Sequence, residues 1–203
     1  MIRNRVKTAV ALAAMGTICL ALPAAANDKG MTWAKAGHDA RLGIDAVACA
    51  AGDDCDAYAG DTACTVALPV LCLKQDGSTR PNYMVHPSGG VMPDAFYRGW
   101  ASGHIATTAP VVGNLLTSAE QADGLCEASF GAGWRMAEHH DGRWIQGMGT
   151  DRYYGNAGLW HSPSPWSSSQ SEGGGWAFWA YGNVRDDTRF WVRIIGQPAN
   201  CWN

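Results

Sequence analysis

The sequence predicts an exported α+β protein with one main helix, short antiparallel strands, a long irregular loop and a framework of disulfides. Three observations predict it. A secretory leader opens the chain, so the cysteines after it are expected to be oxidised. Residues 117–130 alone combine helical spacing with capping residues. The other apolar segments are short and rich in aromatic and β-branched residues, which is typical of strands.

The start of the chain has the three parts of a secretory signal peptide. Basic residues at Arg3, Arg5 and Lys7 are followed by an apolar stretch and by the A-x-A pattern that ends at Ala26. We therefore predict cleavage after Ala26, and a mature protein that is periplasmic or secreted. A membrane anchor is the alternative, but the apolar run is shorter than the ~20 residues that a span needs.

Charge and hydropathy exclude two classes of partner. The chain has 15 Lys and Arg against 18 Asp and Glu, a net charge of −3. Cleavage removes three of the basic residues, which leaves 15 − 3 = 12 against 18 and a net charge of −6. Nucleic-acid binding needs clustered Lys and Arg, so no such partner is expected. No later segment is predicted to span a membrane. We predict no cofactor, and the oligomeric state stays open.

The cysteines predict a disulfide framework. The chain has seven, and loss of Cys19 with the leader leaves 7 − 1 = 6. An even number in an exported chain indicates paired cysteines, whose connectivity the sequence leaves open. Proximity favours two local bridges, and a structural zinc site is disfavoured because no C-x2-C pair is present. The local pairs are Cys49 with Cys55 and Cys64 with Cys72, and the remaining cysteines are Cys126 and Cys201.

Composition divides the chain near residue 96. We predict a signal peptide over residues 1–26, a cysteine-rich N-terminal extension over 27–95 and the main domain over 96–203. The extension is expected to have little core of its own, with one short helix within residues 31–50. Nine of the ten Trp residues lie from Trp100 onward, so the main core is expected in the C-terminal part.

The predicted helix at 117–130 has a start and a stop. Thr117 and Glu120 have the spacing of a capping box, in which two side chains satisfy free amides at the helix start. Apolar residues, Cys126 among them, follow at helical spacing, and Gly131 ends the pattern.

Strands are predicted on both sides of this helix. Residues 96–113 have the composition of one or two strands, and residues 134–137 predict a short one. Strands at 176–184 and 189–195 close the chain, and the RDDT sequence between them predicts a hairpin turn. Apolar side chains alternate in the last strand, so we expect it to be an interior strand of a sheet.

This order of elements resembles the C-type lectin-like fold, in its bacterial and endostatin-like branches. The resemblance rests on that order and on the phrase LTSAEQADGLCEASFGAGWRMAE, and the chain is also similar to secreted bacterial proteins that end in RFWVxIxxQPANCW. The resemblance to the C-type lectin-like fold implies a disulfide between Cys126 on the helix and Cys201 on the final strand. The family's calcium-dependent sugar site is not expected, because QPAN at 197–200 lacks an Asp and follows the last strand.

A long segment rich in Gly, Ser and Pro, residues 145–175, is the favoured binding site. Exposed aromatic rings can stack on sugars or fill pockets on a partner protein. We therefore predict a non-enzymatic binding or adhesion module that recognises a glycan or a protein surface through this loop. The candidate residues are Tyr153, Tyr154, Trp160, His161 and Trp166.

Glu138, His139, His140 and Asp141 form the densest cluster of potential metal ligands. With His161 they suggest an alternative function as a metal-binding protein or a hydrolase. The chain has neither H-E-x-x-H nor G-x-S-x-G, so a polar helix start with Glu138 or Asp141 serving backbone amides is the favoured interpretation. A further alternative is a structural component of a surface appendage.

Overall fold

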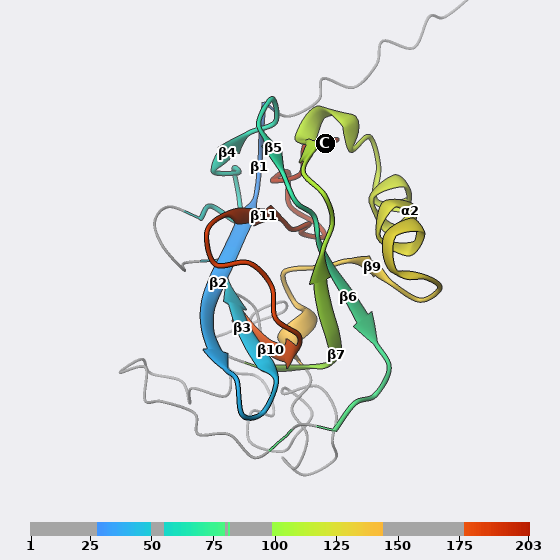
Figure 1. Ribbon diagram of the computed structural model, residues 1–203. Coiled ribbons are helices and arrows are strands. Elements are labelled where there is room, and N and C mark those ends of the chain that lie inside the picture. The colour runs from blue at the N-terminus through green and yellow to red at the C-terminus, as the bar shows by residue number, and fades with distance from the viewer. Residues whose placement is uncertain (1–27, 50–54, 80, 82–98, 144–176) are drawn as a thin grey trace, which may run out of the picture.

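The computed structural model describes five parts of the chain, coloured in Figure 1. These parts form one α-helix and, for the most part, β-strands, which confirms the α+β class. The predicted signal peptide and the predicted loop at 145–175, with all of its candidate binding residues, lie outside the described residues. The described residues are 28–49, 55–79, 81, 99–143 and 177–203.

The main sheet has seven strands in the order β11-β2-β3-β10-β7-β6-β9. All neighbours are antiparallel except β10 and β7, which are parallel. The strands are β2 (Thr32–Asp39), β3 (Ile44–Ala48), β6 (Leu71–Gln75), β7 (Gly99–Thr107), β9 (Arg135–Met136), β10 (Ala177–Tyr181) and β11 (Arg189–Trp191).

Isolated bridges connect the two ends of this strand order, so the sheet curls back on itself. Val70 pairs with Trp191, and Glu138 pairs with Arg193. β11 is therefore hydrogen-bonded on both sides although it begins the strand order, as expected for an interior strand. The described residues also form two small two-stranded sheets and two short 3-10 helices, one after β8 and one after β9. These elements are β1 (Lys29–Gly30) with β4 (Thr62–Ala63), β5 (Ala67–Leu68) with β8 (Val111–Val112), η1 (Gly113–Leu115) and η2 (Asp141–Arg143).

Residues 32–48 form a β-hairpin, so the short helix expected within 31–50 is wrong. β2 and β3 pair antiparallel, and the backbone and side chain of Asp39 accept hydrogen bonds from Gly43 and Leu42 in the turn. Gly43 has a φ of 67°, a left-handed conformation that glycine adopts without strain. The Ala-rich local sequence suits a helix, but pairing with β10 and β11 overrides that preference.

The β2–β3 hairpin lies between β10 and β11, which corrects the predicted hairpin at 176–195. β10 and β11 are not paired with each other, because two strands separate them in the sheet. The same arrangement joins strands from both sides of residue 96 into one sheet, so the predicted boundary there does not divide it. Trp33 of β2 is fully buried in the main core, where the sequence led us to expect little.

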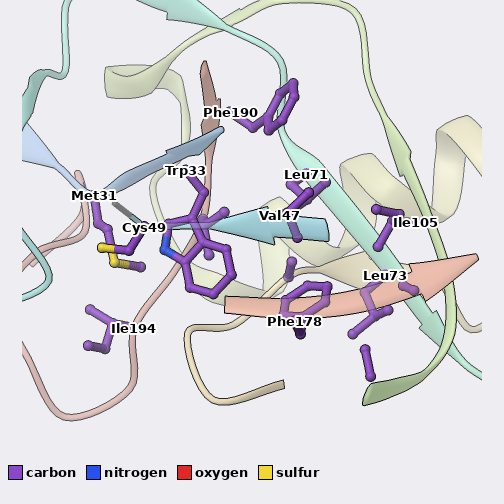
Figure 2. Close-up of a cluster of buried hydrophobic side chains, with 14 of the residues drawn as sticks. Met31, Trp33, Val47, Cys49, Leu71, Leu73, Ile105, Phe178, Phe190 and Ile194 are labelled. Carbon is purple, nitrogen blue, oxygen red and sulfur yellow. The ribbon is translucent and has the colours of Figure 1, made fainter. Parts of the chain in front are cut away.

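The main core lies inside the curled sheet, and Figure 2 shows its side chains pointing toward one another around Trp33. The rings of Trp33 and Phe178 lie 5.4 Å apart between centroids. A second apolar cluster lies between the sheet and the helix, and includes Trp191, Met136 and Ala122. All five of these side chains are buried, so each end of the chain contributes to the interior.

Helix α2 (Ala119–Phe130) confirms the predicted helix, with its start displaced by two residues. Ser118, not Thr117, is the N-cap, and its hydroxyl accepts a hydrogen bond from the Gln121 amide at 3.1 Å. Gln121 in turn accepts from the amide of Thr117, the residue before the N-cap, at 2.8 Å, so Ser118 and Gln121 cap the helix start in place of the predicted Thr117 and Glu120. Gly131 ends the helix with a φ of 98°. No helix within the described ranges is long and apolar enough to cross a membrane.

Three disulfides join the described cysteines. The bridge from Cys49 to Cys55 is confirmed. The predicted pairs Cys64–Cys72 and Cys126–Cys201 are wrong, because the structure pairs Cys64 with Cys201 and Cys72 with Cys126, each with 5.7 Å between Cα atoms. The reason is spatial: β6 carries Cys72 beside the helix, while Cys64 lies where the C-terminal segment ends. The C-terminus is thus pinned to the N-terminal half (Figure 1).

Candidate functional site

The segment from Glu138 to Asp141, the candidate metal cluster, is a buried polar junction. The carboxylate of Glu138 accepts hydrogen bonds from the amide and the Nδ1 of His140 at 2.7 and 2.9 Å, and from the Ile195 amide at 3.1 Å. Burial raises the pKa of Glu138, but the hydrogen bonds and charge of His140 and the bond from Ile195 outweigh burial and lower it. Glu138 is therefore committed to joining this turn to the C-terminal segment.

Asp141 is committed in the same way. It accepts hydrogen bonds from the Arg135 guanidinium and, at 2.6 Å, from the Glu138 amide. Burial raises the pKa of Asp141 above its ordinary value, against the opposing hydrogen bond and charge of Arg135. These bonds confirm that Glu138 and Asp141 serve backbone amides, at the start of the one-turn helix η2.

His139 packs into the core. Its ring meets the Trp33 ring edge-on, with 5.6 Å between centroids. Burial, and then the charge of His140, lower the pKa of His139 to about 3, so the ring is neutral at neutral pH. Within the described parts of the chain, no three His, Cys, Asp or Glu side chains are placed to hold a metal ion. His161, which the metal alternative also uses, lies outside those parts.

A different group of aromatic and polar side chains lies on the outer face of β7 and β10. Tyr181 and His104 are cross-strand partners, and their rings stack with 5.3 Å between centroids and 29° between planes. Trp100 meets Tyr181 edge-on at 5.1 Å. Phe178 on the same strand as Tyr181 points into the core, so strand alternation turns Tyr181 outward.

Two polar residues complete this group. Ser78 Oγ and the Asp76 carboxylate lie 3.2 and 3.3 Å from His104 Nε2. The side chains of His104 and Asp76 are 45% and 34% exposed, so their polar atoms reach solvent. We call Asp76, Ser78, Trp100, His104 and Tyr181 together the His104 surface.

The side chains of Trp100 and Tyr181 hold the segment that contains Ser78 and Thr79 against the sheet through hydrogen bonds. Trp100 Nε1 donates to the Ser78 carbonyl at 2.8 Å, and the Tyr181 hydroxyl donates to the Thr79 carbonyl at 3.0 Å. Burial raises the pKa of Asp76, but the hydrogen bonds of Ser78 and the charge of His104 outweigh it, and the pKa lies below its ordinary value. The carboxylate of Asp76 is therefore ionised at neutral pH.

The arrangement of Ser78, His104 and Asp76 differs from a hydrolytic triad. In a triad the base contacts the nucleophile through one ring nitrogen while a carboxylate holds the other. Here Ser78 and Asp76 both approach Nε2 of His104. The Ser78 hydroxyl also donates to Asp76.

The described residues on either side of the gap from 144 to 176 lie close to each other. Gly99 at the start of β7 pairs with Phe178, near the start of β10. Gly99 also abuts Gly142, since a Cβ added at Gly99 would lie 1.2 Å from the Gly142 carbonyl oxygen. The ends of η2, β7 and β10 thus meet at one place, and β10 leads from it to Tyr181.

A second polar network is structural. The buried carboxylate of Asp45 contacts Lys35 Nζ at 3.0 Å and His38 Nδ1 at 2.6 Å, and accepts from the Val184 amide at 2.6 Å. These bonds hold the connection from β10 to β11 where it passes the β2–β3 hairpin. Lys35 on β2 also donates to the Val184 carbonyl and to Asn183. The contacts of Lys35 and Asp45 therefore fasten the connection to the hairpin.

An open groove of about 630 Å³ lies between the start of α2 and the C-terminal segment. Two of its charged groups are paired, since Arg193 Nη1 lies 2.8 and 2.9 Å from the two Asp123 carboxylate oxygens, and Glu120 also lines the groove. Ile195 on its rim is 70% exposed. Polar side chains also line the groove, but Asp123 and Arg193 bind each other, and Asn200 is used in hydrogen bonds to the backbone of Ile194.

Comparison with known proteins finds no match: no family model, no curated protein and no solved structure matches this chain. The C-type lectin-like resemblance therefore stays a prediction. Sequence reasoning missed the His104 surface because its residues come from three separated segments. The signal that was present is the alternation of β10, in which Trp179 and Tyr181 share the face opposite Phe178.

Proposed function

We propose that this protein is an exported, non-enzymatic binding module that recognises a neutral glycan through the His104 surface. The observation that carries the proposal is the stacked pair Tyr181–His104 with the carboxylate of Asp76 at its edge. Three disulfides fit a protein of an oxidising, extracytoplasmic compartment.

The chemistry of this surface suits a sugar. A pyranose presents C–H groups on its face and hydroxyls around its edge, so it is matched by an aromatic ring bordered by polar side chains. Tyr181 supplies the ring, while Asp76 and His104 supply partly exposed acceptors and donors. Because Asp76 is ionised at neutral pH, it repels carboxylated and sulfated sugars, and neutral glycans are favoured.

The surface is also pre-organised. The ring of Tyr181 is held by its hydroxyl on Thr79 and by the edge of Trp100, which is fully buried. Binding to a ring that is already fixed in place costs less conformational entropy than binding to a ring that becomes ordered only with the ligand. Rigid presentation of a few groups is what a recognition module requires.

A glycan array probed with the oxidised, exported protein tests this proposal. We expect binding to neutral glycans, weakened about ten-fold by Tyr181→Ala and by His104→Ala. Ile195→Ala is the matched control, because it removes an exposed apolar side chain outside the His104 surface. The variants Trp160→Ala and Trp166→Ala test the predicted loop in the same assay.

Two results would reject the glycan proposal. One is an array without hits, and the other is binding that neither Tyr181→Ala nor His104→Ala changes. Capture of a defined protein partner that Tyr181→Ala abolishes would instead assign the same surface to protein recognition.

A further inference from the structure

The two long-range disulfides of this protein are nested. The bridge from Cys72 to Cys126 spans 54 residues and lies, along the chain, inside the bridge from Cys64 to Cys201, which spans 137. Cys49–Cys55 and Cys72–Cys126 each join consecutive cysteines of the chain, whereas two other cysteines lie between Cys64 and Cys201. Pairing in order of appearance would instead join Cys64 to Cys72, which are 72 − 64 = 8 residues apart.

Chain statistics favour that non-native pair. The probability that two residues of an unfolded chain meet falls with about the 3/2 power of their separation. Separations of 137 and 8 residues then favour contact of Cys64 with Cys72 over contact with Cys201 by about 70-fold, as (137/8)^1.5. Cys201 also emerges after Cys64 and Cys72, since it comes last of the six cysteines in chain order. An oxidising compartment therefore meets Cys64 and Cys72 together before Cys201 arrives.

A chain oxidised in this order has no thiol with which to correct itself. Disulfide exchange begins with attack by a thiolate. All six cysteines in the described ranges are bonded, and the remaining one, Cys19, lies in the predicted signal peptide. Once Cys64–Cys72 and Cys126–Cys201 have formed, the attacking thiolate has to come from another molecule.

We propose that this protein matures as a substrate of a thiol–disulfide isomerase in the compartment into which it is exported. The isomerase thiolate attacks Cys64 in the Cys64–Cys72 bridge, forms a mixed disulfide and releases the Cys72 thiolate. Cys72 then attacks Cys126, which forms Cys72–Cys126 and releases the Cys201 thiolate. Cys201 attacks Cys64 in the mixed disulfide, which forms Cys64–Cys201 and returns the isomerase thiolate. Two bridges enter and two leave, with no net oxidation.

The folded product is protected from further exchange. Cys72 and Cys126 are fully buried, and Cys64 and Cys201 are 1% and 3% exposed. A thiolate reaches a disulfide only where the sulfur is accessible. The isomerase therefore acts on chains that have not closed the sheet, and releases those in which the C-terminal segment has docked.

The test is reoxidation of the exported protein after full reduction and denaturation. It is oxidised rapidly without free thiol, alkylated, and mapped by non-reducing peptide mass spectrometry. We expect Cys64–Cys72 to dominate, and a dithiol isomerase with reduced glutathione to raise the yield of Cys64–Cys201 by about ten-fold. A high yield of Cys64–Cys201 without any thiol would overturn the proposal. So would mispaired chains that the isomerase cannot convert.

Two matched double variants sharpen this test. Replacing Cys64 and Cys201 by Ala makes the non-native Cys64–Cys72 bridge impossible. The yield of Cys72–Cys126 should then change less than about two-fold when isomerase is added. Replacing Cys49 and Cys55 by Ala still allows the Cys64–Cys72 bridge, so the yield of Cys72–Cys126 should still depend on isomerase. The readout is the bonded pair itself, which is measured whether or not a variant folds fully. Equal dependence in both variants would contradict the proposal.

Discussion

The ring of Tyr181 stacks on the ring of His104, with 5.3 Å between centroids, and its hydroxyl donates to the Thr79 carbonyl at 3.0 Å. The two roles can be separated. Tyr181→Phe removes the hydrogen bond and keeps the ring, so we expect a loss of about 1 kcal/mol of stability and glycan affinity within about three-fold. Tyr181→Ala removes both. Urea unfolding and calorimetric titration measure the two effects, and equal loss of affinity in both variants would argue against stacking.

His139 makes stability depend on pH. Its pKa is about 3 in the folded protein and 6.5 for an unperturbed histidine, so the unfolded state binds more protons between these values. Stability is therefore fully present above pH 6.5 and falls as the pH drops toward 3, with a slope of up to about 1.4 kcal/mol per unit.

Urea unfolding between pH 6.5 and 5 measures this dependence, and the difference between the unaltered protein and a His139 variant gives the part that His139 contributes. His139→Phe keeps an aromatic ring against Trp33 and removes the titration, so we expect a flatter dependence on pH. An unchanged slope in this variant would assign the acid sensitivity to another group.

Trp33 tests whether the N-terminal strands belong to the main core. It is fully buried, as is Trp191 at the other end of the chain with 1% exposure. We expect Trp33→Ala and Trp191→Ala each to destabilise the whole protein by about 3–5 kcal/mol in a single unfolding transition. If Trp33→Ala leaves the stability of the C-terminal part intact, the chain has a separable extension after all.

The long and the short disulfide should differ in their contributions to stability. In the chain-entropy relation, a loop of 137 residues gives about 5 kcal/mol and one of 6 residues about 2. Replacing Cys64 and Cys201 by Ala should therefore lower the denaturation midpoint more than replacing Cys49 and Cys55. The reverse order would show that local geometry around Cys49 outweighs loop closure.

Local features of the fold could be predicted from the sequence. The helix at 119–130, the strands at 99–107 and 135–136 and the bridge from Cys49 to Cys55 all depend on neighbours in the chain. The hydrogen bonds that Glu138 and Asp141 accept from backbone amides were predictable for the same reason, since each of these amides lies within three residues along the chain. In each case the physical cause acts within one turn or one loop.

Long-range features could not be predicted in this way. The crossing of β10 to β11 over the β2–β3 hairpin, and the parallel register that places Tyr181 beside His104, have no local signature. The pairing of Cys64 with Cys201 likewise depends on the C-terminal segment returning to the start of the fold. Sequence proximity measures loop entropy in the unfolded chain, whereas packing of the closed sheet decides the native partner.

The most direct measurement of this account is the disulfide map of the native, exported protein, obtained by proteolysis without reduction. We predict one peptide pair that links Cys64 to Cys201 and another that links Cys72 to Cys126. Peptides that link Cys64 to Cys72, or Cys126 to Cys201, would contradict the closed sheet and the placement of the His104 surface that depends on it.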